Sequence, residues 1–336
     1  MALKSEQQRT VLGALRRMEL ISDGERPTLI PLTGGVSSLI VKVETAHGAL
    51  CVKQALPRLN VAAEWRAPVE RNSAEVAWLK LAAVLRPHMV PRILGEDGEA
   101  RLFAMRYLDS AVYPTWKSQL RDGVIETATA KAVAENLAAV HAATANDANI
   151  ANRFANDQTF YDLRLEPYLV TAARIHPDCK AALDQLVVTT AGTRRALVHG
   201  DVSPKNILSG PHGPVFLDAE CACYGDPAFD LAFCLNHLLL KSVWRPAGLS
   251  GYMGCFAALA RTYLSRVTWE PAAGLEARTA RLLPGLLLAR IDGKSPVEYI
   301  TRKADRERVR GIAKRLLLAP RERLGEVSRI WEKEQH

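Results

Sequence analysis

Two loop-forming stretches near the middle of the chain contain the side chains best suited to chemistry. The first is HGDVSPKNIL at 199–208, in which Gly200 and Pro204 favour a loop and Asp201 lies five residues before Asn206. A carboxylate can accept the proton of a hydroxyl group, and an amide oxygen can bind magnesium, a cation that prefers oxygen ligands. We therefore expect Asp201 to act as a general base and Asn206 to bind a magnesium ion.

The second stretch, FLDAE at 216–220, follows closely. Asp218 ends an apolar run typical of a strand, which is a natural place for a carboxylate to project into a cleft. Glu220 lies on the same side if the chain stays extended, and there it either supports a metal ion or forms a salt bridge. We expect the two loops to bring Asp201, Asn206 and Asp218 to one place. The alternative is a pair of acidic loops without a catalytic role.

Phosphoryl transfer from a nucleotide also needs a cradle for the phosphates. The segment Gly34, Gly35, Val36, Ser37 and Ser38 lies between two apolar, β-branched runs, where glycines let backbone N–H groups approach phosphate oxygens. The alternative for a glycine pair in this position is an ordinary hairpin turn. We predict a phosphate-binding loop.

The same reaction needs a cation on the phosphates. Lys53 lies in the strand-like run LCVKQAL, where alternation places it on one face with Cys51. Glu75, on the helix expected next in the chain, is the preferred carboxylate partner of this lysine, and Glu64 and Glu70 compete for that position. The alternative is a lysine at a strand edge with its charge in solvent.

Three further side chains have expected structural roles around the two loops. Asp226 precedes Pro227 and is placed to cap the helix that begins there. Asp230 is expected to hold the loop at 199–206 by hydrogen bonds. His199 is an alternative general base, but its position before Gly-Asp predicts that it packs inward and orients the loop.

The hydrophobic pattern predicts a sheet-rich half followed by a helix-rich half. Helices are expected over 3–20 and 71–85, over most of 111–194, and from Pro227 to the end; strands are expected within 28–56 and 90–109 and at 195–201, 206–210 and 213–220. We therefore predict an α+β, bilobal fold. Residues 1–106 form a small antiparallel sheet with one packed helix, residues 107–336 form a larger and mostly helical lobe, and the hinge lies at about 105–110.

Composition excludes several classes of protein. No run of 18 apolar residues is present and charged residues interrupt the first 25, so neither a membrane span nor a signal peptide is expected. The six cysteines lack paired CxxC spacing, which favours reduced thiols in a cytoplasmic protein. The net charge of +8 is carried by helical stretches with interleaved signs, so no nucleic-acid partner is expected. We expect a monomer or a homodimer.

Together, HGDVSPKNIL and FLDAECACYGDPAFDLA resemble the motifs of the aminoglycoside phosphotransferase and choline kinase superfamily, small-molecule relatives of the protein kinases. Over about residues 29–300 the most similar pattern is that of the methylthioribose kinases, in LTGGVSS, VKQALP, AAEWRAPVERN and FDLAFCLNHLLL. The resemblance implies a protein-kinase-like fold, ATP and Mg²⁺ as cofactors, and phosphorylation of a hydroxyl group. It also implies that Met105, Tyr107 and Leu108 contact adenine and that Asp201 and Arg290 contact the acceptor.

Two departures bear on the acceptor. The paired arginines that mark the methylthioribose site correspond here to Ala289-Arg290, and VSPKN is similar to the aminoglycoside and choline kinase form. From residue 220 onward the chain has 19 Lys and Arg against 13 Asp and Glu, which disfavours a polycationic aminoglycoside. Choline would need an aromatic or acidic cage, and the candidate aromatic residues of this region are alternatively core residues: Trp244, Tyr252, Trp269 and Tyr299.

These observations predict an ATP-dependent O-phosphotransferase that acts on a small, sugar-like metabolite similar to methylthioribose. A neutral or anionic hydroxylated compound fits Arg290 and Lys294 best. The alternatives are an aminoglycoside or other antibiotic phosphotransferase, a choline or homoserine kinase, and a nucleotide-binding pseudokinase. The last is disfavoured because the base, both metal ligands and the lysine are all present.

Overall fold

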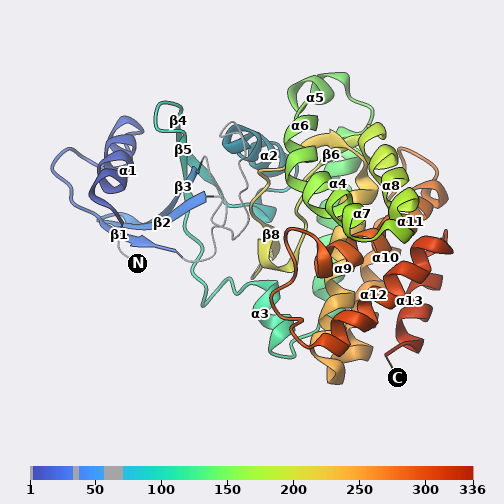
Figure 1. Ribbon diagram of the computed structural model, residues 1–336. Coiled ribbons are helices and arrows are strands. Elements are labelled where there is room, and N and C mark those ends of the chain that lie inside the picture. Colours follow the sequence, from blue (N-terminus) through green and yellow to red (C-terminus); the bar gives the residue numbers. More distant parts are fainter. Residues whose placement is uncertain (1–2, 33–37, 57–70, 336) are drawn as a thin grey trace.

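The structure, a computed structural model, describes residues 3–32, 38–56 and 71–335 and has two lobes (Figure 1). The N-terminal lobe contains α1 (Ser5–Arg17), β1 (Thr28–Pro31), β2 (Ser38–Thr45), β3 (Gly48–Ala55), α2 (Arg71–Leu85), β4 (Ile93–Asp97) and β5 (Leu102–Arg106). The C-terminal lobe contains α3 (Trp116–Arg121), α4 (Thr127–Thr144), α5 (Ala148–Arg153), α6 (Asp157–Phe160), the π-helix η2 (Tyr161–Val170), α7 (Thr171–Ile175), α8 (Lys180–Gly192), β6 (Ala196–Val198), β7 (Ile207–Gly210), β8 (Gly213–Phe216), β9 (Cys223–Gly225), α9 (Pro227–Trp244), α10 (Leu249–Leu264), α11 (Ala272–Asp292), α12 (Lys303–Leu318) and α13 (Leu324–Lys333).

The antiparallel sheet of the N-terminal lobe positions Lys53. Its strands run in the order β1-β2-β3-β5-β4, and Lys53 of β3 lies opposite Ile40 of β2 and Phe103 of β5. Successive side chains of a strand point to opposite faces. Val52 belongs to the buried cluster that includes α1, whereas Cys51 belongs to the cluster that includes α2. Lys53 shares the face of Cys51, so its side chain points toward α2.

Helix α2 lies between the sheet and the C-terminal lobe (Figure 1). Its apolar side, with Trp78 and Leu79 buried, packs into the core, and the helix ends at Leu85 because Pro87 cannot continue it. Glu75 lies one turn before Leu79 and is 2% exposed. The packing of an apolar helix on an apolar sheet face therefore brings Glu75 and Lys53 together.

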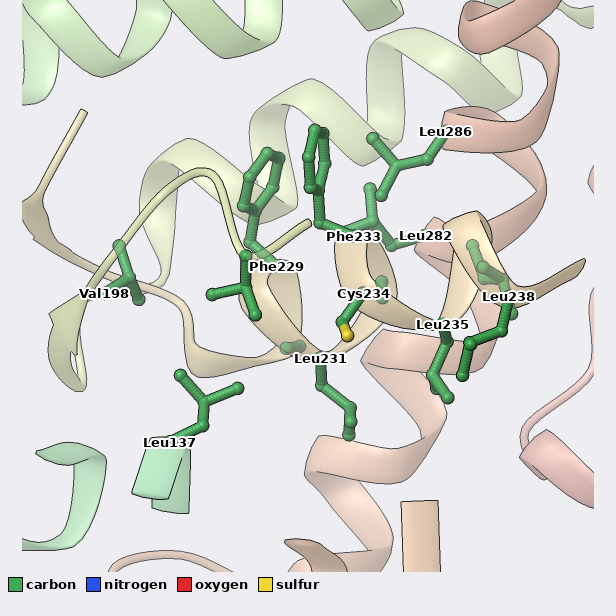
Figure 2. Close-up of a cluster of buried hydrophobic side chains, with 14 of the residues drawn as sticks. Leu137, Val198, Phe229, Leu231, Phe233, Cys234, Leu235, Leu238, Leu282 and Leu286 are labelled. Carbon is green, nitrogen blue, oxygen red and sulfur yellow. The ribbon is translucent and has the colours of Figure 1, made fainter. Parts of the chain in front are cut away.

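Helix α9 forms the centre of the C-terminal lobe. It is apolar on almost every side, as expected for a helix buried on all sides, and packs against α10 and α11. Figure 2 shows Phe229 and Phe233 of α9 with Leu282 and Leu286 of α11 in one buried cluster. The beginning of α9 also contacts β6, so this helix holds the loop that follows β6.

The expected α+β fold with a sheet-containing lobe and a helical lobe is confirmed. The predicted helix at 71–85 has the predicted bounds, while the first helix is shorter than 3–20. Sequence analysis missed the strand β9 and the π-helical form of residues 161–170. The lobe boundary at 106 stays a prediction, although β5 ends at Arg106. None of the helices described is both long enough and apolar enough to cross a membrane.

Candidate functional site

A buried ion-pair cluster connects the two lobes. Lys53 Nζ lies 2.7 Å from one carboxylate oxygen of Glu75 and donates a hydrogen bond of 2.9 Å to the other. It also donates a hydrogen bond to Oδ1 of Asp218, which follows β8. The side chains of Lys53 and Glu75 are 4% and 2% exposed, against 26% for Asp218. Of the three candidate glutamate partners, Glu75 pairs with Lys53, and Glu64 and Glu70 lie outside the described residues.

Burial and charge act in opposite directions on this cluster. Burial lowers the pKa of Lys53, but the nearby carboxylates of Asp218 and Glu75 outweigh burial and hold the pKa above its ordinary value. Burial raises the pKa of Asp218, but Lys53 and Lys205 hold it below its ordinary value. For Glu75 burial outweighs the attraction of Lys53, and its pKa is raised. Asp218 is therefore the carboxylate that stays ionised and can attract a further cation.

Asp230 of α9 anchors the loop at 199–206 by hydrogen bonds. One carboxylate oxygen of Asp230 accepts a hydrogen bond of 2.7 Å from the backbone N–H of His199, and the other accepts one of 2.8 Å from Gly200. Asp230 is fully buried and also contacts the imidazole of His141. The expected structural role of Asp230 is confirmed. Asp226 likewise caps α9, because its side chain accepts a hydrogen bond from the backbone N–H of Ala228.

His199 packs inward, as predicted. Its ring lies edge-on to Trp78 with ring centroids 4.8 Å apart, and it is 1% exposed. Nδ1 accepts a hydrogen bond from the backbone N–H of Asp201, while Nε2 lies 3.1 Å from the carbonyl oxygen of Leu217. Burial lowers the pKa of His199 more than the nearby carboxylates raise it, so the ring is neutral. With both ring nitrogens engaged, His199 orients the loop and is not available as a base.

Backbone geometry explains why glycine stands at position 200. Gly200 has a φ of +78°, and a Cβ atom there would lie 2.7 Å from the carbonyl oxygen of Cys221. Asp218 also adopts a positive φ, of 68°, which is uncommon for a residue other than glycine. The two loops therefore approach each other closely, and Asp218 holds a strained conformation of the kind that clusters at functional sites.

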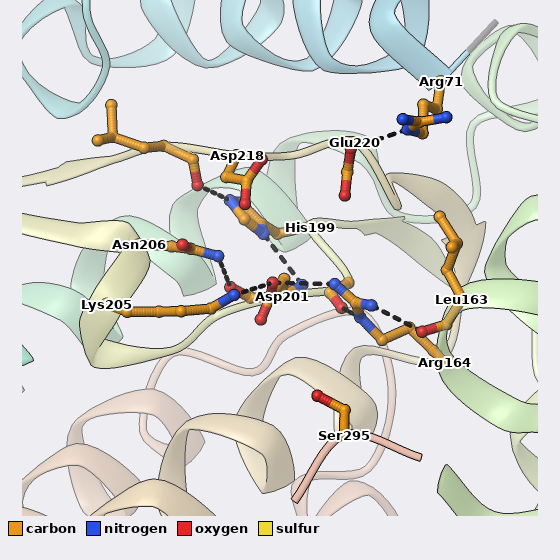
Figure 3. Close-up of polar contacts among 12 residues, drawn as sticks. Arg71, Leu163, Arg164, His199, Asp201, Lys205, Asn206, Asp218, Glu220 and Ser295 are labelled. Carbon is orange, nitrogen blue, oxygen red and sulfur yellow. Dashed lines mark hydrogen bonds and ion pairs between the residues drawn. The ribbon is translucent and has the colours of Figure 1, made fainter. Parts of the chain in front are cut away.

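Asp201 forms ion pairs with two cations. Among the described residues, neither cation pairs with another carboxylate. Arg164 Nη2 of the π-helix η2 lies 2.9 Å from Oδ2 of Asp201, and Lys205 Nζ lies 3.4 Å from the same oxygen (Figure 3). Arg164 also donates hydrogen bonds to the carbonyl oxygens of Gly200 and Leu163. Within the described parts of the chain, no hydrogen bond or ion pair to Oδ1 of Asp201 is found. That oxygen is free to accept a proton.

The residues proposed to hold magnesium fit such an ion. Asn206 donates a hydrogen bond from Nδ2 to the backbone oxygen of Asp201, which leaves its Oδ1 as an available ligand. In Asp218, Oδ1 accepts from Lys53, and Oδ2 has no hydrogen bond to any residue in the described ranges. Mg²⁺ commonly takes one or two protein oxygens and completes its shell with water and substrate phosphates. Asn206 and Asp218 provide that donor set.

Glu220 forms the salt bridge that was the alternative to a metal-site role. Its Oε2 accepts a hydrogen bond of 3.0 Å from Nε of Arg71, the first residue of α2. Arg71 is buried and also donates to the carbonyl oxygen of Leu56. This second buried ion pair between the lobes lies beside Asp218 in Figure 3. Support of a metal ion by Glu220 stays a prediction.

The residues predicted to bind the nucleotide lie at the edge of the same region. Met105 is in β5 on the face of the sheet that meets α2, and Tyr107 and Leu108 follow it, half-buried, at the crossing into the C-terminal lobe. Ser38 begins β2 and is buried. The remaining members of the predicted phosphate loop lie outside the described residues: Gly34, Gly35, Val36 and Ser37.

Arg290 of α11 is connected to Arg164, the partner of Asp201, through the side chain of Tyr168. Its Nη1 donates hydrogen bonds to the hydroxyl groups of Tyr168 and Ser295, at 3.3 and 2.9 Å. The guanidinium of Arg164 in turn lies over the ring of Tyr168, 6.0 Å from the centroid of that ring. Sequence analysis missed Arg164, Lys205 and Arg71. Lys205 and Arg71 lie inside the quoted stretches HGDVSPKNIL and AAEWRAPVERN, whereas no local signal marks Arg164.

Comparison with known proteins shows the family to which the chain belongs. Residues 28–275, more than half of the chain, match the model of the phosphotransferase enzyme family. The chain belongs to this family. The match confirms the superfamily resemblance found in the sequence. The members of this family and the relatives of this chain are small-molecule kinases.

Among curated relatives are methylthioribose kinases. The methylthioribose kinase of Enterobacter sp. (strain 638) is 27% identical to this chain over 249 residues, and that of Yersinia enterocolitica is 28% identical over 246 residues. The alignments cover 66% and 65% of this chain and 61% of each of the two kinases. The chain thus spans about three fifths of the length of the curated relatives that it matches.

Solved structures of small-molecule kinases share the fold. The amicoumacin kinase hAmiN, in complex with AMP-PNP and Ca²⁺, has a TM-score of 0.56 at 11% identity and covers 96% of this chain and 98% of its own. An aminoglycoside phosphotransferase of Alicyclobacillus acidocaldarius has a TM-score of 0.52 at 13% identity, with coverage of 100% and 98%. At these identities the likeness establishes the kinase-like fold alone.

Proposed function

We propose that this chain transfers the γ-phosphoryl group of ATP to a hydroxyl group of a small, sugar-like molecule. The observation that carries the proposal is the meeting of two predicted half-sites. Lys53 of the sheet contacts Asp218 of the C-terminal lobe, beside the loop that holds Asp201 and Asn206. A magnesium ion bound by Asn206 and Asp218 would neutralise charge on the transferred phosphoryl group.

Each residue has a role that follows from its contacts. Lys53 has its ammonium group between two carboxylates and can exchange Asp218 for a phosphate oxygen while Glu75 holds it in place. Asp201 would accept the proton of the acceptor hydroxyl through Oδ1. Arg164 fixes the other carboxylate oxygen, so that Oδ1 keeps its orientation.

The charges near Asp201 bear on the choice of acceptor. An aminoglycoside is a polycation, but the groups around Asp201 are themselves cationic, namely Arg164 and Lys205. Choline would need an open aromatic cage. Trp244 and Tyr299 do lie together, but the ammonium of Lys241 already occupies their ring faces, at 5.1 and 4.6 Å from the centroids. A sugar-like acceptor is favoured, in agreement with the relatives that are methylthioribose kinases.

The test is a coupled ADP-release assay with methylthioribose, other pentoses, hexoses, choline, homoserine and aminoglycosides. We expect activity on a sugar-like compound, and Asp201→Asn should lower kcat by at least about a hundredfold, since general-base catalysis contributes roughly 10²–10⁴-fold. Calorimetric affinity for ATP–Mg²⁺ should persist in that variant. Wild-type turnover of Asp201→Asn would remove Asp201 from its role, and ATP binding without activity on any acceptor would favour a pseudokinase.

The proposal also includes the cytoplasm as the place of the reaction, because the reaction consumes ATP. All six cysteines are free and buried, which is compatible with a reducing compartment.

A further inference from the structure

Two buried basic side chains on α9 each carry a nitrogen without a hydrogen-bond partner in the described part of the chain. His237 and Lys241 are four residues apart on the same face of the helix and are 6% and 1% exposed. Nε2 of His237 and Nζ of Lys241 find no hydrogen-bond partner among the described residues. The same holds for Nε of Arg290, which is 8% exposed. We call His237, Lys241 and Arg290 the α9 basic cluster.

An unpaired ammonium group in this environment is costly. Buried charges in proteins are normally paired with an opposite charge, because transfer out of water without compensation costs several kcal/mol per ion. For Lys241 the compensation within the described structure comes from the π-faces of Trp244 and Tyr299 and from the charge of Glu298, which forms no ion pair with it. A contact with such a π-face is worth up to about 2 kcal/mol when desolvated. The cluster therefore leaves an interaction unmade, which an anion would complete.

The carboxylates of this region are already matched by other cations. Glu298 pairs with Lys117 of α3, and Glu166 of η2 pairs with both Arg174 and Lys294. Asp201 is paired with Arg164 and Lys205, as described above. Neither Lys241 nor Arg290 forms an ion pair with any carboxylate in residues 3–32, 38–56 or 71–335. The excess of positive charge in the region is thus carried by Lys241 and Arg290 of the α9 basic cluster.

Contacts between aromatic rings connect this cluster to the proposed catalytic base. The guanidinium of Arg164, which pairs with Asp201, lies 5.9 Å from the ring centroid of Phe233. The ring of Phe233 lies 5.3 Å from that of His237, one turn further along α9. Arg290 reaches the same region by its hydrogen bond to Tyr168. Along this path two side chains, those of Arg164 and Phe233, separate His237 from Asp201.

The charged groups around His237 are positive. Burial lowers the pKa of His237 well below its ordinary value, and the positive charges of Arg290, Lys241, Lys205 and Lys117 lower it further. Lys205 is the cation of the catalytic loop.

We propose that the acceptor carries an anionic group, a carboxylate or a phosphate, that binds to Lys241, His237 and Arg290 while its hydroxyl group faces Asp201. The inference rests on the proposed function. The acceptor oxygen forms a bond to the γ-phosphorus of ATP, the bond from that phosphorus to the β,γ-bridging oxygen breaks, and ADP leaves with the electron pair. The hydroxyl proton passes to Asp201. The anionic group takes no part in the bonds that change, and it selects and orients the acceptor.

The first test measures binding without turnover. With the nucleotide site filled by AMP-PNP and Mg²⁺, inorganic phosphate and glucuronate are titrated while the thermal unfolding midpoint is recorded. We expect each anion to raise the midpoint of the wild type, and Lys241→Met to remove that rise. Lys303→Met is the matched control, because Lys303 is an exposed lysine of α12 with a side chain that is 90% exposed. No rise in the wild type, or an equal rise in Lys241→Met, would overturn the inference.

The second test measures selectivity in the ADP-release assay. Ribose, ribonate and ribose 5-phosphate are compared, so that the arms separate a carboxylate from a phosphate. We expect kcat/KM at least tenfold higher for one anionic compound than for ribose. Lys241→Met should raise KM for that compound at least tenfold and leave KM for ATP unchanged. Preference for ribose would refute the anionic acceptor while leaving the proposed function intact, whereas failure of the wild type to bind AMP-PNP with Mg²⁺ would refute the proposed function itself.

Discussion

Replacement of Arg164 tests whether Asp201 is held by its ion pair with the π-helix. Arg164→Gln removes the guanidinium that lies 2.9 Å from Asp201 Oδ2 and also donates to the carbonyl oxygen of Gly200. Breaking a buried ion pair by removing one partner costs about 3–5 kcal/mol. Because Lys205 remains 3.4 Å from the same oxygen, we expect the lower end, about 3 kcal/mol of unfolding free energy.

The effect of Arg164→Gln on catalysis follows from orientation. A misplacement of about 1 Å can cost about a hundredfold in rate, so we expect kcat to fall by about that factor while KM for ATP stays within twofold. Arg164→Lys keeps the charge but loses the forked geometry and should be intermediate. Arg174→Gln is the matched control, because Arg174 is an exposed arginine of α7 with a side chain that is 63% exposed.

The assays are urea unfolding and ADP release, the latter measured at a temperature where each variant is folded. A wild-type kcat in folded Arg164→Gln would refute the positioning role of Arg164. An effect confined to KM for the acceptor would instead assign Arg164 to acceptor binding.

Three further predictions concern the metal site, the loop anchor and the basic cluster. Asp218→Ala should weaken calorimetric binding of ATP–Mg²⁺ at least tenfold and leave binding of metal-free ATP unchanged; equal affinity for ATP–Mg²⁺ would contradict the ligand assignment. Asp230→Ala leaves two buried backbone N–H groups unpaired, at about 1–3 kcal/mol each, so urea unfolding should reveal a loss of about 2–6 kcal/mol; a loss below about 1 kcal/mol would refute the anchoring role. Burial and the positive charges of Lys117 and Arg121, opposed by Glu298, lower the pKa of Lys241 to about 8. Between pH 8 and the ordinary pKa of a lysine, the unfolded chain binds more protons than the folded chain, so the wild type should gain stability relative to Lys241→Met as pH rises through this window. Anion binding should weaken above pH 8. A difference in stability that does not change with pH would contradict the lowered pKa of Lys241.

The parts of the site that local sequence rules govern could be predicted. Alternation along β3 places Lys53 and Cys51 on the face toward α2, and the packing of that helix supplies Glu75. Gly200 adopts a positive φ, which glycine permits, so the HGD turn is a local property of the chain. Residue type and spacing determine short-range geometry of this kind.

Contacts between distant segments could not be predicted in the same way. Arg71 and Glu220 are 149 residues apart, and Arg164 lies 37 residues before Asp201 in a π-helix that contains Pro167. A π-helix does not follow the 3.6-residue period on which the search for helices depends. Which arginine pairs with which carboxylate is decided by the packing of the lobes, and a sequence with many arginines offers many equivalent partners.

Helix α9 explains why the reaction was easier to predict than the acceptor. Asp230, His237 and Lys241 are spaced by seven and four residues, so they lie on nearly one face of the helix. The first holds the catalytic loop by hydrogen bonds to backbone groups, a requirement of the loop whatever the acceptor. The other two lie on later turns, next to Phe233 and Trp244, and within the described residues they form no hydrogen bond to that loop. Because one rigid helix carries both functions, replacing Lys241 is expected to alter the choice of acceptor while the geometry around Asp201 persists.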